Sequence, residues 1–410
     1  MSFDLLKGIF PIGGWVGPSA AGGGSPSFLE DKYFELLKDS GINLMYGNTE
    51  HNGSPEVMRG LTLCDKYGIS YLVNDSRFRS EDFSAEEGLA ALNEYQKHPS
   101  FVGIAVHDEP FLKDMESLRL ARERHKKVFE KTCFHTNLFP IYCDSAGVTM
   151  RETHENSSYE EYVHYIETYI DCVNPDHLSY DFYPFKGKEN EVDPVYFENL
   201  EFIRAYAEKL KVPYWCFIQV TSWHKGVIRN TTEKEIRWQV FTSLAYGSKG
   251  INYFTFCTPI DCYAALFDEA MLDRKGRPTP SYYYVQNVNK RLIKIGKELL
   301  YAEHKTIIPP IKKVAPIESP IARTNCGILK NVRGDTCLTG IFEKNGEPLY
   351  FICNTDFEQS ADYKMMFEKN VKLQNVETGE FYEGDAVSLC IPPADGVLLK
   401  IKHKEIENDG

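Results

Sequence analysis

Two adjacent acids, Asp108 and Glu109, end an apolar run at residues 101–106, with His107 before them and Pro110 after them. A buried carboxylate costs several kcal/mol unless it is paired or hydrogen-bonded, so a core strand that ends in two acids needs a partner or a use for them. A neighbouring anion raises the pKa of a carboxylic acid, and an acid that keeps its proton near neutrality can act as a general acid. The pair therefore predicts acid–base chemistry. The alternative is a helix N-cap with a surface ion pair, because Pro110 fits the first turn of a short helix.

The two acids can serve one site only if the backbone changes direction beside them. Successive side chains on a strand point to opposite faces, so an unbroken strand would separate Asp108 from Glu109. Pro110 favours a break at this point. His107 either hydrogen-bonds one of the acids or packs as a structural histidine.

The composition limits the partners of the chain. The 410 residues carry a net charge of −13, whereas nucleic acids and anionic membranes bind clustered Lys and Arg, so we expect neither as a partner. The chain contains 25 Tyr, 25 Phe and 4 Trp. Aromatic faces suit sugars, in which C–H and O–H groups alternate, although an aromatic core would give the same composition.

The cysteine and histidine patterns point to no cofactor. The 11 Cys form no CxxC pair, which predicts reduced thiols rather than disulfides or a zinc site. No HExxH or GxSxG motif occurs, so we expect no metal, no cofactor and no serine nucleophile. The first residues lack the pattern of a signal peptide, and no apolar run is long enough to span a bilayer. These features predict a cytoplasmic protein.

Short apolar runs alternate with helical patterns through most of the chain. The runs begin near residues 7, 41, 68, 101, 134, 177, 212 and 249. Apolar strands that alternate with helices indicate a parallel sheet covered by helices, and eight such units predict a (β/α)8 barrel of the α/β class. Two capping-box patterns, Ser84 to Glu87 and Thr232 to Glu235, mark helix starts. An open doubly wound sheet is the alternative, but no GxGxxG motif follows the first run.

The pattern changes from about residue 310 to short alternating strands. The turn pairs Asn345-Gly346, Thr378-Gly379 and Asp395-Gly396 separate several of these strands. This pattern predicts an antiparallel β-sandwich. We therefore expect a catalytic barrel at residues 1–305 and a C-terminal β-sandwich at residues 306–410.

In a (β/α)8 barrel the active site lies at the carboxyl ends of the strands, so the residues at the end of each apolar run are site candidates. In chain order these residues are Trp15, Asn48, Glu50, His51, Asn74, Asp75, Arg77, His107, Asp108, Glu109, Asp144, Asp181, Tyr183, Gln219, Trp223, Tyr253 and Thr255. They form a ring of carboxylates, amides and aromatic side chains with few cations. Trp15 and Trp223 are candidate sugar platforms, whereas Trp215 lies within a run and is more typical of a core residue.

The segments "YDFYPF", "PYWCFIQ" and "TEKEIRWQVFTSLAYGSKGINYFTF", taken with the acidic pair, resemble bacterial glycoside hydrolases with (β/α)8 barrels, in general the β-galactosidase-like retaining enzymes. The segment "LYFICNTDFEQSADYKMMF" resembles the β-sandwich that often follows such barrels. These enzymes place an acid/base Glu after strand four, where Glu109 stands, and a nucleophilic Glu at the end of strand seven. Gln219 occupies the second position, and an amide cannot attack an anomeric carbon, which puts the two-carboxylate double displacement in doubt.

A second resemblance accounts for this departure. The "HDEP" ending is similar to that of bacterial β-N-acetylgalactosaminidases, which belong to the substrate-assisted hexosaminidases, and "LSYDFYP" resembles the strand-six Tyr-Asp pair of chitinase-like enzymes. The resemblance implies that Glu109 is the general acid/base and that Asp108 orients the 2-acetamido group of the sugar. It also implies that Tyr180 or Tyr183 holds the acetamido carbonyl.

Three hypotheses follow for an oligosaccharide or glycoside ligand. The first is an exo-acting β-N-acetylhexosaminidase that uses Asp108 and Glu109, with N-acetylgalactosamine as the favoured sugar. The second is a β-galactosidase-like or inverting hydrolase that pairs Glu109 with Asp181. The third is a carbohydrate-binding pseudoenzyme, which Gln219 suggests. The substrate-binding candidates also include His107, Asp181, Gln219 and Tyr253, and the sequence leaves a homo-oligomer open.

Overall fold

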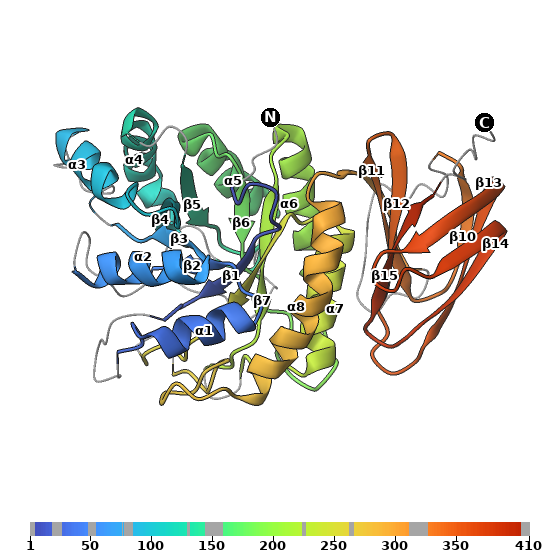
Figure 1. Cartoon of the computed structure of the whole chain (residues 1–410). Coiled ribbons are helices and arrows are strands. Elements are labelled where there is room, and N and C mark those ends of the chain that lie inside the picture. The colour runs from blue at the N-terminus through green and yellow to red at the C-terminus, as the bar shows by residue number, and fades with distance from the viewer. Residues whose placement is uncertain are drawn as a thin grey trace, which may run out of the picture.

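The computed structural model describes residues 5–18, 27–47, 55–75, 77, 85–128, 132–143, 159–223, 227–261, 266–310 and 327–402. Of the predicted site residues, Asn48, Glu50, His51 and Asp144 lie outside these ranges, as does Ser84 of the first capping box. The chain forms two parts, a helix-covered parallel sheet and a C-terminal antiparallel sheet (Figure 1).

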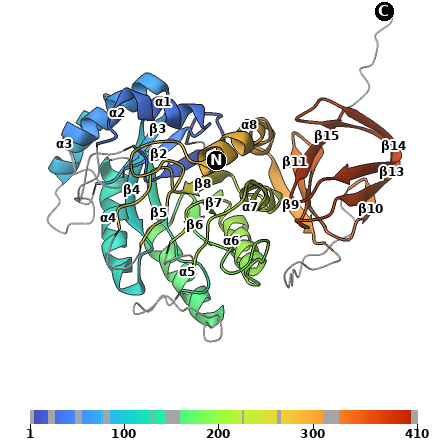
Figure 2. The ribbon, with the colours of Figure 1, turned by 90° about the horizontal axis from the view of Figure 1, so that it is seen from below.

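The first part is a (β/α)8 barrel, as predicted. Its eight strands pair in parallel in the order β5-β4-β3-β2-β1-β8-β7-β6, and a parallel bridge between Leu138 and Tyr180 closes the ring between β5 and β6. Figure 2 shows the helices arranged around these strands. The strands are β1 (Ile12–Trp15), β2 (Leu44–Tyr46), β3 (Ser70–Val73), β4 (Phe101–Asp108), β5 (Cys133–Asn137), β6 (Leu178–Tyr180), β7 (Tyr214–Gln219) and β8 (Gly250–Phe254).

One predicted strand start was wrong. The first strand begins at Ile12 rather than near residue 7, because Lys7 and Gly8 have φ angles of 51° and 90° and form a turn instead of extended backbone. The other strands begin within three residues of the predicted positions. The helices are α1 (Asp31–Asp39), α2 (Pro55–Tyr67), α3 (Ala85–Tyr95), the short 3-10 turn η2 (Leu112–Asp114), α4 (Met115–Val128), α5 (Tyr159–Val173), α6 (Tyr196–Leu210), α7 (Glu233–Ala245) and α8 (Pro280–Leu299).

Alternate residues of the strands point into and out of the barrel. On β5, Phe134 packs outward in the core beneath the helices, whereas Cys133 packs in the inner cluster with Tyr46 and Trp215. The interior is therefore filled with side chains, and any ligand must bind above them at the carboxyl ends of the strands.

The second part is a seven-stranded antiparallel sheet that curls into two layers. The strands are β9 (Glu303–Ile308), β10 (Leu329–Arg333), β11 (Cys337–Lys344), β12 (Glu347–Asn354), β13 (Ala361–Asn375), β14 (Phe381–Ile391) and β15 (Gly396–Ile401). The long strand β13 pairs with β10, β14 and β15, with a register shift between Met366 and Val371. A core that includes Ile341, Tyr350 and Phe367 lies between the layers, which gives the sandwich-like arrangement that the sequence predicts.

The sequence divides this sheet differently in two places. Residues 363–369 and 371–375, expected as parts of separate strands, belong to one strand, β13, because a bulge rather than a turn lies between them. Strand β9 was not predicted, and the expected boundary between residues 305 and 306 falls within it. The division of the chain into two domains at that point stays a prediction.

Helices α7 and α8 lie between the barrel and the C-terminal sheet (Figure 1). Nearly every residue of α7 is buried, as expected for a helix covered on all sides. The predicted capping box is confirmed: the Thr232 hydroxyl accepts a hydrogen bond from the Glu235 amide, and the Glu235 carboxylate accepts one from the Thr232 amide. Arg291 of α8 reaches the sheet, with Nε 2.6 Å from Glu377 and Nη1 2.7 Å from Asp395.

The described cysteines are all free, and most of them are buried, in agreement with the prediction of reduced thiols. None of the helices in the described ranges is both long enough and apolar enough to cross a membrane.

Candidate active site

The end of β4 turns both acids toward the mouth of the barrel. A register shift against β5 between Ala105 and His107 marks a bulge, which redirects the last residues of the strand. Glu109 then adopts a left-handed conformation with φ of 48°, held by its amide, which donates to the Asn137 carbonyl at 2.9 Å. A residue other than glycine rarely takes this conformation, and such residues cluster at functional sites. The expected break in the strand is thus present, one residue before Pro110.

Asn137, the last residue of β5, links the carboxylates at the mouth. Its side-chain Nδ2 lies 3.3 Å from Asp108 Oδ1 and 3.1 Å from Asp181 Oδ1, so one amide group donates to both acids. Its Oδ1 accepts a hydrogen bond from the Ser179 hydroxyl at 3.0 Å, which fixes the amide orientation. Asp181 directly follows β6 and is 5 % exposed, so strands β4, β5 and β6 together build this cluster.

Asp181 also contacts Glu109. The charge of the Asp181 carboxylate and its hydrogen bonding with Glu109 both raise the pKa of Glu109, after burial, which is the largest cause. The Tyr183 hydroxyl donates to Asp181 from the other side. Asp108, Glu109 and Asp181 therefore form one group of acids around Asn137.

Burial raises the pKa of all three acids. Removal from bulk water raises the pKa of Glu109 well above its usual value, and the charges of Asp181 and Asp108 raise it further. Burial and then the charge of Asp108 raise the pKa of Asp181 to about 7. Desolvation raises the pKa of Asp108 to about 6, and the hydrogen bond from Asn137 opposes this rise. The Asp108 residue is nevertheless exposed to solvent on one side. Near neutral pH, Glu109 therefore keeps its proton and Asp108 is mostly ionised.

Aromatic side chains form a wall beside the acids. The rings of Tyr183 and Trp223 are perpendicular with centroids 4.8 Å apart, and Phe254 lies 5.3 Å from Tyr183 and 5.1 Å from Trp223. Trp15 packs edge-on against Phe217 at 5.4 Å and continues the wall toward the barrel interior. The structure thus brings the predicted residues Trp15, Tyr183 and Trp223 to one cluster at the end of the barrel where the acids lie.

Two predicted substrate-binding tyrosines do not face the mouth. Tyr180 is 2 % exposed in the outer core, and its hydroxyl lies 3.7 Å from Cys216 Sγ. Tyr253 is fully buried and donates to Asn289 Oδ1 of α8 at 2.7 Å. In contrast to the prediction, both point away from the acids because they occupy the outward positions of their strands. Of the two strand-six tyrosines, only Tyr183 reaches the site.

Gln219 differs from the prediction, and His107 bonds neither of the two acid side chains. Gln219 is fully buried, and its side-chain amide binds backbone: Oε1 accepts from Phe185 N, and Nε2 donates to the Phe185 and Arg229 carbonyls, at 2.7–2.9 Å. No group of this amide remains for a sugar. His107 is half-buried, and its Nδ1 donates to the Asp108 carbonyl at 2.8 Å rather than to either carboxylate.

Sequence reasoning missed Asn137 and Tyr142. The apolar residues after Asn137 extend the strand-five run, so its end was placed at Asp144 rather than at the true end of β5. Tyr142 is 7 % exposed, and its ring centroid lies 3.8 Å from the Lys186 ammonium. Burial raises the pKa of Tyr142, and the charges of nearby groups, Asp181 and Glu109 among them, raise it further. Within the described ranges, no three His, Cys, Asp or Glu side chains are placed to hold a metal ion.

Known structures share this fold. An α-amylase from Anoxybacillus aligns with a TM-score of 0.54 at 7 % identity over 97 % of this chain and 99 % of its own. An α-amylase from Geobacillus thermoleovorans, solved with acarbose, aligns with a TM-score of 0.52 at 9 % identity over 96 % and 98 %. A β-galactosidase from the psychrophilic Marinomonas ef1 aligns with a TM-score of 0.52 at 8 % identity over 72 % and 62 %. No protein-family model and no curated protein sequence matches the chain. At these identities the likeness shows the fold alone.

Proposed function

We propose that this chain is a retaining, exo-acting glycoside hydrolase, a β-N-acetylhexosaminidase that favours N-acetylgalactosamine and uses the 2-acetamido group of its substrate as the nucleophile. The observation that carries the proposal is the linked cluster of Asp108, Glu109 and Asp181, in which one acid keeps its proton near neutrality. The names of the similar structures, α-amylase and β-galactosidase, agree with glycoside hydrolysis as the reaction class.

In the first step Glu109 gives its proton to the glycosidic oxygen while the bond from that oxygen to C1 breaks. The acetamido carbonyl oxygen forms the new bond to C1, which produces an oxazolinium ion and releases the alcohol. Ionised Asp108 accepts the acetamido N–H and faces the positive charge that develops on the ring. In the second step the Glu109 carboxylate takes a proton from water, and that water attacks C1 and restores the acetamido group with retained configuration.

The remaining groups position the sugar and the acids. Asn137 keeps Asp108 oriented, since its Nδ2 donates to Oδ1 of that acid at 3.3 Å. Asp181 raises the pKa of Glu109 and thereby keeps the donor protonated. Trp223 and Tyr183 supply an aromatic surface for the apolar face of the sugar, while the Tyr183 hydroxyl binds Asp181.

Two alternatives fit the geometry less well. An inverting pair needs its carboxyl groups about 6.5–9.5 Å apart to hold a water molecule, whereas the effect of Asp181 on the pKa of Glu109, through charge and hydrogen bonding, supports a closer pair. A two-carboxylate retaining enzyme needs a nucleophile about 5–5.5 Å from the acid, and the strand-seven residue, Gln219, is committed to backbone contacts. The acetamido group supplies the nucleophile that these positions lack.

The test is hydrolysis of matched p-nitrophenyl β-glycosides of N-acetylgalactosamine, N-acetylglucosamine, galactose and glucose. We expect cleavage of the acetamido sugars alone and a loss of at least about a hundredfold in Asp108→Asn and Glu109→Gln. Glu116→Gln, an exposed glutamate of the helix that follows β4, serves as the matched control and should keep wild-type activity. Equal cleavage of galactoside would remove the acetamido group from the mechanism, and sugar binding without turnover would indicate a pseudoenzyme.

A further inference from the structure

The loop between β12 and β13 carries a phenylalanine from the C-terminal sheet into the barrel. Phe357 is 4 % exposed, and its ring centroid lies 5.4 Å from Trp238 of α7 and 6.1 Å from Phe185, which follows β6. Phe185 and Trp238 lie 5.9 Å apart, so the three rings pack as one cluster. Trp238 Nε1 also donates to the Thr355 carbonyl at 3.2 Å, and Lys234 Nζ to the Phe357 carbonyl at 3.3 Å. This cluster joins the C-terminal sheet to the base of the strand-six loop.

Gln219 connects Phe185, in the strand-six loop, to the strand-seven loop. Its buried amide binds both backbone groups of Phe185 and the carbonyl of Arg229. Phe185 lies two residues after Tyr183, and Arg229 lies in the loop that begins with Trp223. One side chain thus fixes the two loops that carry the aromatic wall.

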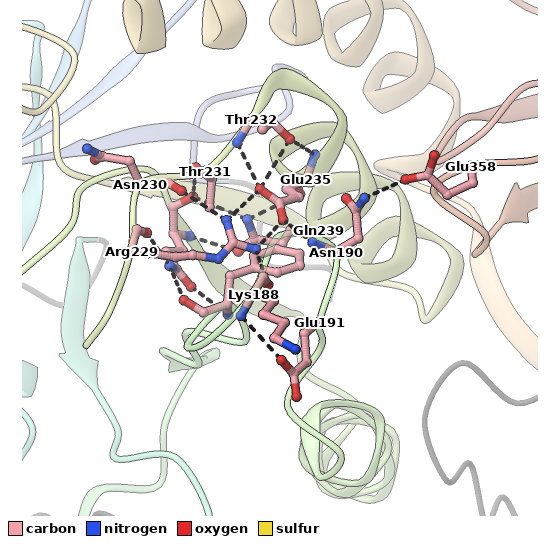
Figure 3. Close-up of polar contacts among 12 residues, drawn as sticks. Lys188, Asn190, Glu191, Arg229, Asn230, Thr231, Thr232, Glu235, Gln239 and Glu358 are labelled. Atoms are coloured by element: carbon pink, nitrogen blue, oxygen red, sulfur yellow. Dashed lines mark hydrogen bonds and ion pairs between the residues drawn. The ribbon is translucent and has the colours of Figure 1, made fainter. Parts of the chain in front are cut away.

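A second connection runs through Glu235, which is fully buried (Figure 3). Its carboxylate pairs with the Arg229 guanidinium, which lies 3.0 Å from Oε2, and accepts hydrogen bonds from the Asn190 amide at 3.0 Å and the Thr232 amide at 2.9 Å. The Asn190 side chain then donates to Glu358 of the C-terminal sheet at 2.7 Å. The strand-six loop, the strand-seven loop and the sheet therefore meet at this carboxylate.

The aromatic wall lies at the outer end of the same two loops. Lys186 and Ile228 form an antiparallel bridge between them, and Trp223 N donates to the Ile228 carbonyl at 3.0 Å. Tyr183 and Trp223 meet ring to ring across this bridge. A shift of Phe185 should therefore move Tyr183 as well, because only one residue separates them in the chain.

We propose that Phe357 is a positioning residue, through which the C-terminal sheet sets the placement of Tyr183 and Trp223 and hence the affinity of the site for its sugar. The inference rests on the proposed function where it names a sugar as the ligand. Asp108 and Glu109, the two acids that carry out the proposed reaction, are held separately, by Asn137 and the ends of β4 and β5. Loss of the Phe357 ring should therefore weaken sugar binding and leave the chemical step nearly unchanged.

The experiment compares Phe357→Ala with Phe367→Ala, a matched control of the same sheet. Phe367 is 3 % exposed and packs against Tyr350 inside the sandwich, 5.8 Å between centroids, away from the barrel. We expect Phe357→Ala to raise KM on the acetamido glycoside on the order of tenfold, with kcat within about twofold and an unchanged pH profile. Phe367→Ala should lower the melting temperature comparably and keep the wild-type KM. Equal KM values in the two variants would overturn the proposal.

Trp223 fluorescence separates this inference from the proposed function. The Trp223 emission of each protein is isolated by subtracting the spectrum of the same protein that also carries Trp223→Phe. Quenching of this emission by acrylamide should change in Phe357→Ala and stay unchanged in Phe367→Ala. If the wild-type chain cleaved no sugar, the proposed function would fail, while a changed Trp223 emission would still support the positioning role. Unchanged emission would contradict it. Should Phe357→Ala not fold, Phe357→Leu against Phe367→Leu gives the same comparison.

Discussion

At the scale of single residues, the site depends on neighbouring acids whose negative charges oppose one another's ionisation. Burial raises the pKa values of Asp108, Glu109 and Asp181, and neighbouring acid charges raise those of Glu109 and Asp181 further, whereas the Asn137 amide lowers those of Asp108 and Asp181. This arrangement keeps a proton available for the leaving oxygen, and it lowers the stability of the folded chain once the acids ionise.

Because ionisation of these acids destabilises the folded chain, we predict that the variant Asp181→Asn is more stable than the wild type at high pH. Burial and the charge of Asp108 raise the pKa of Asp181 to about 7, so between pH 4 and 7 the folded state holds a proton that the unfolded state releases. Stability of the wild type should therefore fall as the pH rises through this window. The variant should be equally stable near pH 4 and more stable by roughly 1–3 kcal/mol at pH 8, measured by urea unfolding at both values.

Asp273→Asn provides a control of opposite sign. Burial raises the pKa of Asp273, but hydrogen bonds from Arg277 and the Lys275 amide outweigh this and lower it. Its carboxylate therefore stabilises the fold above the unfolded pKa, and the variant should be less stable at pH 8 than the wild type. A stability difference for Asp181→Asn that is the same at both pH values would contradict the account.

At the scale of elements, strand ends and helix caps decide where the functional side chains lie. The capping box of α7 is shared with the loop network, because Glu235 binds both Thr232 and Arg229. Replacing Thr232 by Ala should destabilise the chain by about 1 kcal/mol, as for other N-cap losses, measured as a lower urea midpoint. Thr168→Ala, an exposed mid-helix threonine of α5, should change stability by less than half of that. Equal effects would show that the cap contributes nothing.

The sequence predicts most elements but not the direction of each side chain. The eight strands read as apolar runs with helices between them, and strands covered on both faces lack the alternation that would reveal which residues point inward. Tyr180 and Tyr183 therefore looked equivalent, although only Tyr183 reaches the acids. The acidic pair could be found because a run of apolar residues ends abruptly there. Asn137 could not, because apolar residues continue past the true end of β5.

At the scale of the whole molecule, the C-terminal sheet packs against the barrel, and we expect the two to unfold together. It covers α7 and α8, and Arg291 of α8 pairs with Glu377 and Asp395. Arg291→Met would remove the Arg291 ion pairs of the partly buried Glu377 and Asp395, of which Asp395 keeps Arg237 at 3.6 Å, so we expect a loss of about 1–3 kcal/mol and a single calorimetric transition. Arg119→Met, which breaks exposed pairs within α4, should cost less than about 1 kcal/mol. Separate transitions of barrel and sheet would contradict this view.

The central claim is that the acetamido group of the substrate attacks C1 while Glu109 protonates the leaving oxygen. The most direct measurement is kcat/KM for p-nitrophenyl N-acetylgalactosaminides in which the acetamido methyl carries successively more fluorine. Fluorine withdraws electrons from the carbonyl oxygen, so a nucleophilic acetamido group predicts a steep fall, on the order of a hundredfold or more across the series. Rates that stay level across the series would contradict substrate assistance and return the search to a second carboxylate.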